Sequence, residues 1–288
     1  MNWKLAGMAG TAVLTVALSG VGAVAGANKF TGNVSLSAGE TFEDSDLSSP
    51  FDDESFASIS GGAKLNIAFT NNINLQLGLN GDAAFFDVSD DRKTGFAVDA
   101  HVYTRNDNYA VGVFGGVGSN ATDDFASAEH YFVGVEGQYY WKNFTFGLNG
   151  GYLDSDTSTS GFPSDLFLSD AWFTNAEVRW YATPKVTVTA NLGYISGEVL
   201  AGTADSDTLH WGAKAEYWPE EKEPLSLWVA YEGRSTDLDF SPSEFNKETH
   251  TIKIGVTFHF GVDGGSQDND RHGPAFNTMD YGAVVVGG

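Results

Sequence analysis

The side chains best suited to acid–base or metal chemistry in this chain are its six histidines, since cysteine is absent. A metalloprotease or a serine hydrolase would typically carry them in an H-E-x-x-H motif or together with a G-x-S-x-G turn, and the sequence contains neither motif. We therefore predict no catalytic residue, no metal site and no cofactor. A protease built from loop carboxylates and a histidine is the enzyme class that the pattern leaves open. The histidines are His101, His130, His210, His250, His259 and His272.

Alternating apolar and polar residues indicate the elements that position these side chains. Between Thr251 and Phe260 every second residue is apolar, and Lys253 and His259 are among the residues between. Strict alternation predicts a strand with one apolar and one polar face. The pattern recurs in twelve segments, near 29–42, 56–69, 72–87, 95–105, 109–119, 129–141, 143–154, 171–182, 185–197, 208–218, 224–234 and 248–260.

The connections between these segments alternate in length. Short turns are expected at 71–72, 106–108, 142, 183–184 and 219–224. Longer loops are expected at 43–55, 88–94, 120–128, 155–170, 198–207 and 235–247. Successive hairpins would then place all short turns at one end of a sheet and all long loops at the other. An even number of strands puts both ends of the sheet on the short-turn side.

Aromatic residues recur at both ends of the apolar face. Tyr131 and Tyr139 are eight residues apart on one segment, and Trp172 and Trp180 repeat that spacing on another. Eight residues of a tilted strand rise about 20 Å, which is close to the ~25 Å apolar band between two aromatic girdles of a membrane barrel. The predicted girdle residues are Phe69, Phe85, Phe96, Tyr109, Tyr131, Tyr139, Phe144, Tyr152, Trp172, Trp180, Tyr194, Tyr217, Tyr231 and Phe258.

These features resemble those of outer-membrane β-barrel, porin-like proteins of Gram-negative bacteria. The resemblance covers about 29–260 and also rests on the strand that ends at Phe258 and Phe260. It implies an all-β, transmembrane, antiparallel up-and-down barrel of twelve strands, closed by pairing of 248–260 with 29–42. It further implies a bacterial outer-membrane location and recognition of the last strand by the barrel assembly machinery. A soluble β-sandwich or propeller would also alternate, but it gives no reason for aromatics at both ends of the apolar face.

The polar parity of the strands would face the lumen of such a barrel. Basic and acidic residues are equally frequent there, and several lie two apart, such as Glu177 with Arg179, Lys214 with Glu216 and Glu232 with Arg234. A balanced wall fits either structural ion pairs or a polar solute path, and inward glycines favour a narrow water-filled pore. The predicted pore-lining residues are Lys64, Asp82, Asp99, Arg105, Glu136, Glu177, Arg179, Lys214, Glu216, Glu232, Arg234 and Lys253.

Both termini lie outside the alternating region. Lys4, an apolar run and the Ala25-Gly26-Ala27 sequence indicate a cleaved signal peptide over 1–27, followed by a barrel over 28–261. Residues 262–288 are rich in turn formers, so we expect a periplasmic tail that is disordered or that docks at the barrel mouth. Its apolar patches, 275–276 and 283–286, are the parts that would dock there as a plug.

The formal net charge of −23 excludes nucleic acid as a partner. It also predicts a preference for cations, because the long loops hold half of the acidic residues and few basic ones. The implied function is passive diffusion of small hydrophilic solutes or ions. The expected partners are outer-membrane lipid and lipopolysaccharide, the assembly machinery, small polar solutes or cations, and a second copy of the chain. A structural or adhesive barrel with a closed lumen is the alternative function, and a barrel hydrolase is a more remote one.

Overall fold

The structure is a computed structural model that describes residues 30–45, 55–69, 72–86, 92–122, 127–157, 167–200, 202–220, 223–240 and 243–285. The predicted signal peptide, residues 1–27, lies outside these ranges. So do many acidic residues of the predicted loops, such as those at 46–54 and 123–126.

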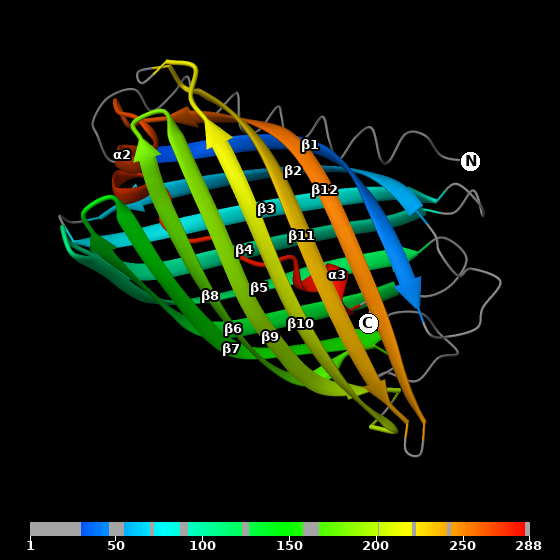
Figure 1. Ribbon diagram of the computed structural model, residues 1–288. Helices are drawn as coiled ribbons and strands as arrows, with labels where there is room; N and C mark the ends of the chain where they lie inside the picture. The colour runs from blue at the N-terminus through cyan, green and yellow to red at the C-terminus, as the bar shows by residue number, and fades with distance from the viewer. Residues whose placement is uncertain are drawn as a thin grey trace.

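Twelve antiparallel strands form one closed barrel, in which every strand pairs with its neighbours in the sequence (Figure 1). The strands are β1 (Phe30–Ser45), β2 (Ser55–Ala68), β3 (Ile73–Phe86), β4 (Arg92–Arg105), β5 (Tyr109–Thr122), β6 (Ser127–Trp141), β7 (Phe144–Thr157), β8 (Ser169–Thr183), β9 (Val186–Val199), β10 (Ala204–Tyr217), β11 (Leu225–Asp239) and β12 (Glu244–Phe260). The predicted strand number and up-and-down topology are confirmed.

The barrel closes between β1 and β12. Their register runs from Gly32 opposite Phe260 to Ser45 opposite Lys247, so the last strand is paired along most of its length. This confirms that the stretch 248–260 closes the sheet against the first strand. Closure removes the unpaired edges that an open sheet would expose.

Several strands extend further at the long-loop end than the alternation predicts. β11 continues to Asp239 instead of ending near 234, and β12 begins at Glu244 instead of 248. The residues added are mostly polar, for example Asp237 and Asp239 opposite Asn246 and Glu244. The backbone ladder does not require an apolar face, so it continues after the apolar alternation has ended.

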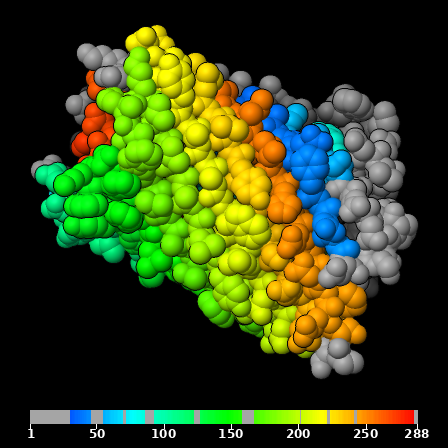
Figure 2. Space-filling view, viewed as in Figure 1, coloured from blue at the N-terminus to red at the C-terminus, as the bar shows by residue number. Residues whose placement is uncertain are grey.

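The outer surface of the barrel is apolar, and Figure 2 shows part of it over the obliquely running strands β8 to β12. Residues such as Val135, Leu148 and Ile254 are exposed there. Of the fourteen predicted girdle residues, twelve are exposed, and Phe144 and Tyr194 are half-buried. They all lie on the outward parity, and their role as an interfacial girdle stays a prediction.

The C-terminal segment enters the barrel. After β12 the chain forms α2 (Ser266–His272) at the short-turn end, runs on without regular structure, and ends with α3 (Tyr281–Val285) among the strands (Figure 1). Residues 261–285 are thus folded and continue into the lumen beyond the mouth, instead of being disordered or docking only at the mouth. Neither helix, nor any other helical stretch in the described ranges, is long and apolar enough to span a membrane.

Candidate functional site in the barrel lumen

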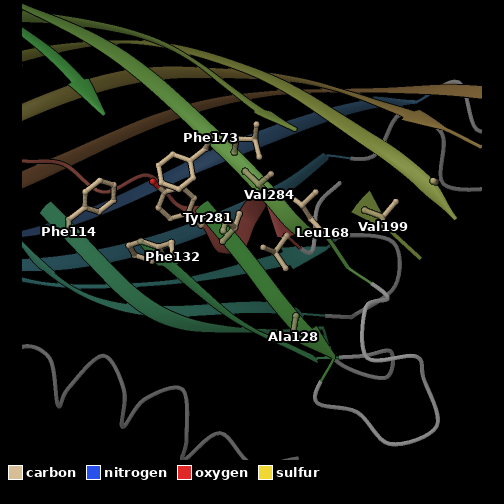
Figure 3. Packing of buried hydrophobic residues seen from close by; sticks show 13 residues of the cluster. Phe114, Ala128, Phe132, Leu168, Phe173, Val199, Tyr281 and Val284 are labelled. Carbon is tan, nitrogen blue, oxygen red and sulfur yellow. The ribbon is translucent and has the colours of Figure 1, made fainter. Parts of the chain in front are cut away.

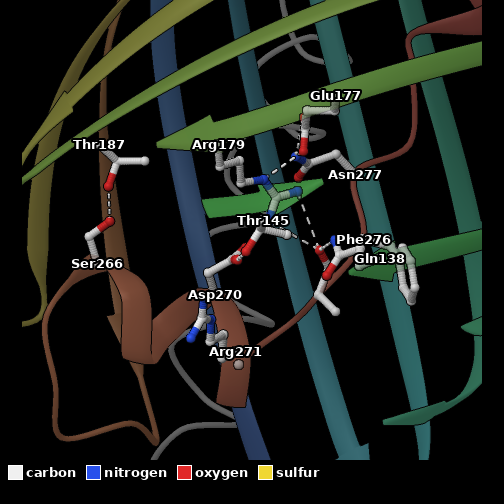
Figure 4. Close-up of polar contacts among 12 residues, drawn as sticks. Gln138, Thr145, Glu177, Arg179, Thr187, Ser266, Asp270, Arg271, Phe276 and Asn277 are labelled. Carbon is white, nitrogen blue, oxygen red and sulfur yellow. Dashed lines mark hydrogen bonds and ion pairs between the residues drawn. The ribbon is translucent and has the colours of Figure 1, made fainter. Parts of the chain in front are cut away.

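Helix α2 is fixed at the short-turn end by side-chain contacts (Figure 4). Ser266 hydrogen-bonds to Thr187 of β9, and Asp270 forms an ion pair with Arg179 of β8. Arg271 donates to the carbonyl of Lys142 at 2.6 Å, in the turn between β6 and β7. These contacts involve α2 side chains, so this part of the tail is recognised by its sequence.

The segment after α2 is held mainly through its backbone. Arg105 donates to the carbonyl of Gly273 at 2.7 Å, and Gln138 donates to that of Ala275 at 2.6 Å. Gln76 both donates to the carbonyl of Phe276 at 2.8 Å and accepts from its amide at 3.2 Å. The wall therefore satisfies the polar backbone of a segment that has no regular secondary structure of its own.

A buried cluster of two carboxylates and one imidazole lies beside this segment. His101 contacts Glu136 through Nδ1 at 2.8 Å and Asp99 through Nε2 at 2.9 Å, and its side chain is 0% exposed. The same Nε2 atom lies 3.2 Å from the hydroxyl of Thr278. An imidazole that carries both protons can donate to both carboxylates, which would otherwise repel each other.

Aromatic residues surround α3 further along the lumen (Figure 3). The ring of Tyr281 lies 4.5 Å from that of Phe132 and 4.8 Å from that of Phe173. Phe114, Leu153, Leu168 and other apolar residues complete one buried cluster with Val284 and Val285. Burial raises the pKa of Tyr281 well above its ordinary value, so its hydroxyl stays neutral. These inward aromatic residues of the strands pack against the tail.

Eleven of the twelve predicted pore-lining residues fall into two groups. Lys64, Asp99, Arg105, Glu136, Glu177, Arg179 and Arg234 all reach the tail or the cluster beside it; Lys64 donates to the Phe276 carbonyl and Arg234 to the Ala283 carbonyl. Lys214, Glu216, Glu232 and Lys253 lie across the lumen from most of these contacts, on β10, β11 and β12. Asp82 is half-buried on β3.

Ion pairs join strand residues to one another in the described part of the lumen, and two of the three predicted pairs form. Arg179 contacts Glu177 at 2.6 Å, and Lys214 contacts Glu216 at 3.0 Å, as their spacing predicts. The third expected pair is wrong: Glu232 pairs with Lys253 of β12 at 2.6 Å, not with Arg234. Pairing of β11 with β12 brings Lys253 next to Glu232, while Arg234 donates a hydrogen bond to the carbonyl of Ala283 in the tail.

A polar cavity of about 330 Å³ remains between the tail and the opposite wall. It is lined by residues of β1, β2 and β8 to β12 and by the tail. Lys214 lies over the ring of Trp228 at 4.9 Å, and Glu232 and Asn191 also face this space. The tail thus fills one side of the lumen and leaves a narrow, charge-balanced space on the other.

One further histidine has a serine and a carboxylate beside it. The hydroxyl of Ser226 lies 3.0 Å from Nε2 of His259 and also donates to Glu216. In a serine hydrolase the imidazole would contact the serine through one nitrogen and the acid through the other. Here the serine proton already points to Glu216, the same Nε2 faces both partners, and Ser226 is 0% exposed. This arrangement does not fit a proton relay for hydrolysis.

At the long-loop end of the barrel, Asp237 accepts a hydrogen bond from Asn246 at 2.7 Å. Within the described ranges no three His, Asp or Glu side chains converge to hold a metal ion.

Comparison with known proteins rests on structure alone, because no family model matches the sequence and none of the curated proteins does. The structure is similar to that of an outer membrane channel from Pseudomonas putida F1, with a TM-score of 0.55 and 13% identity, over 81% of this chain and 96% of that one. It is also similar to the β domain of the Bordetella autotransporter BrkA, with a TM-score of 0.50 and 13% identity, over 80% of this chain and 100% of that one.

The chain has the fold of a bacterial outer-membrane β-barrel. Its exposed apolar belt and closed sheet are the features that such a location requires, since lipid can satisfy no backbone polar group. At 13% identity this similarity shows the fold alone.

Sequence reasoning missed the polar residues that receive the tail. Gln76, Gln138 and Thr145 lie on the inward parity but carry no charge, so a search for lumen charges passes over them. The apolar patches at 275–276 and 283–286 predicted docking at the mouth only. The inward aromatic residues Phe114, Phe132 and Phe173 are the signal that could have extended this prediction into the lumen, since they pack against α3.

Proposed function

We propose that this barrel is an outer-membrane channel for passive diffusion of small hydrophilic solutes or ions. The observation that carries the proposal is the polar, charge-balanced cavity between the tail and β9 to β12. A barrel closed for structural reasons alone would be expected to fill its interior with side chains, as small barrels do. Here one side of the lumen is filled by the tail and the other side keeps room for water.

The size of the remaining space favours small solutes. About 330 Å³ is near the lower end of the roughly 300–1,000 Å³ typical of small-molecule sites. Its walls offer paired charges, such as Lys214 with Glu216, together with amide and hydroxyl groups. Such a lining replaces part of the hydration of a polar solute and gives no comparable benefit to an apolar one.

Cation preference follows from charge outside the lumen. The net charge of −23 is far larger than any imbalance among the lumen residues, and many acidic residues lie in the long connections. A mouth of one sign raises the local concentration of counter-ions and repels anions. Selectivity should therefore fall as added salt screens this field.

Planar-bilayer recording of the refolded full chain tests both parts of the proposal. We expect small, discrete current steps and, in a salt gradient, a reversal potential on the cation-selective side. An anion-selective reversal potential would contradict the preference for cations. A complete lack of current, both in the full chain and in variants that loosen the tail, would contradict a channel function.

The alternative is a structural or adhesive barrel whose lumen the tail keeps closed. It is favoured by the packing of α3 against Phe132 and Phe173, which fills one side of the lumen. In either role we expect the outer belt to contact lipid and lipopolysaccharide, and β12 to be recognised by the assembly machinery. Association with a second copy of the chain also remains a prediction.

A further inference from the structure

The tail consists of two parts that are bound in different ways. Helix α2 is held by specific side chains, including Ser266 against Thr187 and Asp270 against Arg179. Residues 273–285 are held mostly by wall side chains that donate to backbone carbonyls. Gly273 ends α2 and separates the two parts. One part is thus an anchor, and the other is bound as a separate peptide would be.

Backbone recognition occurs toward both ends of the second part. Carbonyl oxygens of Gly273, Ala275, Phe276 and Ala283 each accept from one or more donors of the wall. These donors come from six different strands: Lys64 (β2), Gln76 (β3), Arg105 (β4), Gln138 (β6), Arg179 (β8) and Arg234 (β11). Carbonyl groups are present in every peptide, so these contacts do not depend on the side chains of the tail.

Two aromatic side chains supply the specificity that the backbone contacts lack. Phe276 stacks on His101 with centroids 5.9 Å apart and meets Tyr103 edge-on at 5.0 Å. Five residues later, Tyr281 packs between Phe132 and Phe173. Aromatic anchors in pockets formed by partner rings commonly dominate peptide binding.

We propose that the inner wall formed by β2 to β8 and β11 is a binding site for a peptide with two aromatic residues five positions apart. Residues 273–285 occupy this site within the same chain as a removable plug, while α2 stays anchored. The cationic donors of the wall, and the single charge of the plug at Asp280, favour a neutral or acidic peptide over a basic one. Release of the plug widens the passage, a consequence that rests on the proposed channel function.

A vacant site would not leave its polar groups unsatisfied. Lys64 and Arg179 already line the cavity beside the tail. Release of the tail would admit water to the other donors as well, and water can replace the tail carbonyls at modest cost. Release would instead expose the apolar side chains around Tyr281 and Val284, which makes the aromatic anchors the main barrier to opening. Removing these anchors should therefore open the plug without disturbing the strand ladder.

Met279 allows this opening to be measured without any current. It is the only methionine beyond residue 8, and it packs against the aromatic cluster around α3. In the full chain carrying Phe276→Ala and Tyr281→Ala, we expect peroxide to oxidise Met279 roughly tenfold faster than in the parent, as for a segment with lowered local stability. Phe96→Ala, on the outer face, is the matched control and should leave the rate unchanged. Circular dichroism verifies that each variant retains its β-structure. The single variants Phe276→Ala and Tyr281→Ala are expected to give intermediate oxidation rates.

A peptide with the sequence of residues 273–285 then tests the site directly. Its binding to the double variant is measured separately from Met279 oxidation, by fluorescence anisotropy of a dye-labelled peptide. We expect saturable binding to the double variant, weaker binding to the parent, whose own plug competes, and no binding of a peptide in which both aromatics are alanine. Equal binding of the two peptides, or no binding to a folded double variant, would overturn the proposal.

A disulfide lock separates the plug from the anchor. A Cβ atom at Gly282 would lie against the side chain of Asn120 on β5, so the Asn120→Cys/Gly282→Cys pair should cross-link α3 to the wall in this cysteine-free chain. In the double-alanine background the oxidised lock should restore slow Met279 oxidation and reduce current, and reduction should restore the current. The Thr187→Cys/Ser266→Cys pair, which fixes only α2, should do neither.

These readouts distinguish failure of the plug from failure of the channel. Peptide binding with no current in any variant would contradict the proposed channel function but not the peptide site. Equal current in the locked and released forms, with no peptide binding, would contradict the removable plug but not the channel function. Unchanged Met279 oxidation in a folded double variant would also contradict a removable plug.

Discussion

The ring of Phe276 lies parallel to that of His101, with an interplanar angle of 6° and a centroid distance of 5.9 Å. Phe114 stacks on His101 as well, at 5.5 Å. The imidazole is therefore covered by phenyl rings from the tail and from β5 while Asp99 and Glu136 contact its two nitrogens. A polar cluster of the wall and an apolar residue of the tail thus depend on the same side chain.

Replacement of His101 should destabilise the barrel. In His101→Leu, Asp99 and Glu136 would remain buried without a shared donor, and loss of one partner of a buried charged cluster typically costs about 3–5 kcal/mol. We expect a lower midpoint of thermal unfolding, measured by circular dichroism. His130→Leu is the matched control, because His130 is also buried but neither of its ring nitrogens has a hydrogen-bond partner among the residues that the structure describes. An equal loss in both variants would contradict a special role for the cluster.

On the exposed apolar face of the barrel, an arginine substitution should cost more folding free energy at the centre than near either end. Val135 lies midway between Tyr131 and Tyr139 on β6 and is 64% exposed. Val135→Arg should cost about 2–4 kcal/mol in a bilayer, whereas Tyr139→Arg, on the same strand near the interface, should cost much less. Folding equilibria in lipid vesicles measure both. Similar small costs at both positions would argue against a lipid-facing belt.

The pair formed by Lys253 and Glu232 offers a test of the lumen path. Glu232→Gln leaves a lumen cation without its carboxylate, and Lys253→Gln leaves the reverse. We expect the reversal potential to shift toward anions in the first variant and toward cations in the second, with the double variant close to the parent. Permeating ions pass near this pair only if the cavity beside β11 and β12 is the path. Unaltered selectivity in both single variants would place the path elsewhere.

The outward apolar face can be tested against the lumen face on one strand. On β12, Ile254 points outward and is 64% exposed, whereas Lys253 points inward. A spin label or polarity-sensitive dye on Ile254→Cys should report lipid, and the same probe on Lys253→Cys should report water. The chain has no cysteine of its own, so each probe labels one position. A water signal at Ile254 would contradict the assigned parity.

Much of the barrel could be predicted because a strand alternates its side chains between two environments. Ile252, Ile254 and Val256 mark one face of β12 and Lys253 the other, so parity alone separated the outer surface from the lumen. Turn length and an even strand number then gave the topology. Strand ends at the long loops were less predictable, because hydrogen bonding continues through residues such as Asp237 that carry no apolar signal.

The sequence by itself determined the strands, their order, their faces and two of the lumen ion pairs, because these depend on neighbours within a strand or across one hairpin. Only the tertiary structure decided how the lumen is filled. Phe276 meets His101 across 175 positions of sequence (276 − 101), and Arg234 donates to the carbonyl of Ala283 in the tail, not to Glu232 on its own strand. Such contacts depend on closure of the sheet and on the path of the tail inside it, and no local periodicity records either.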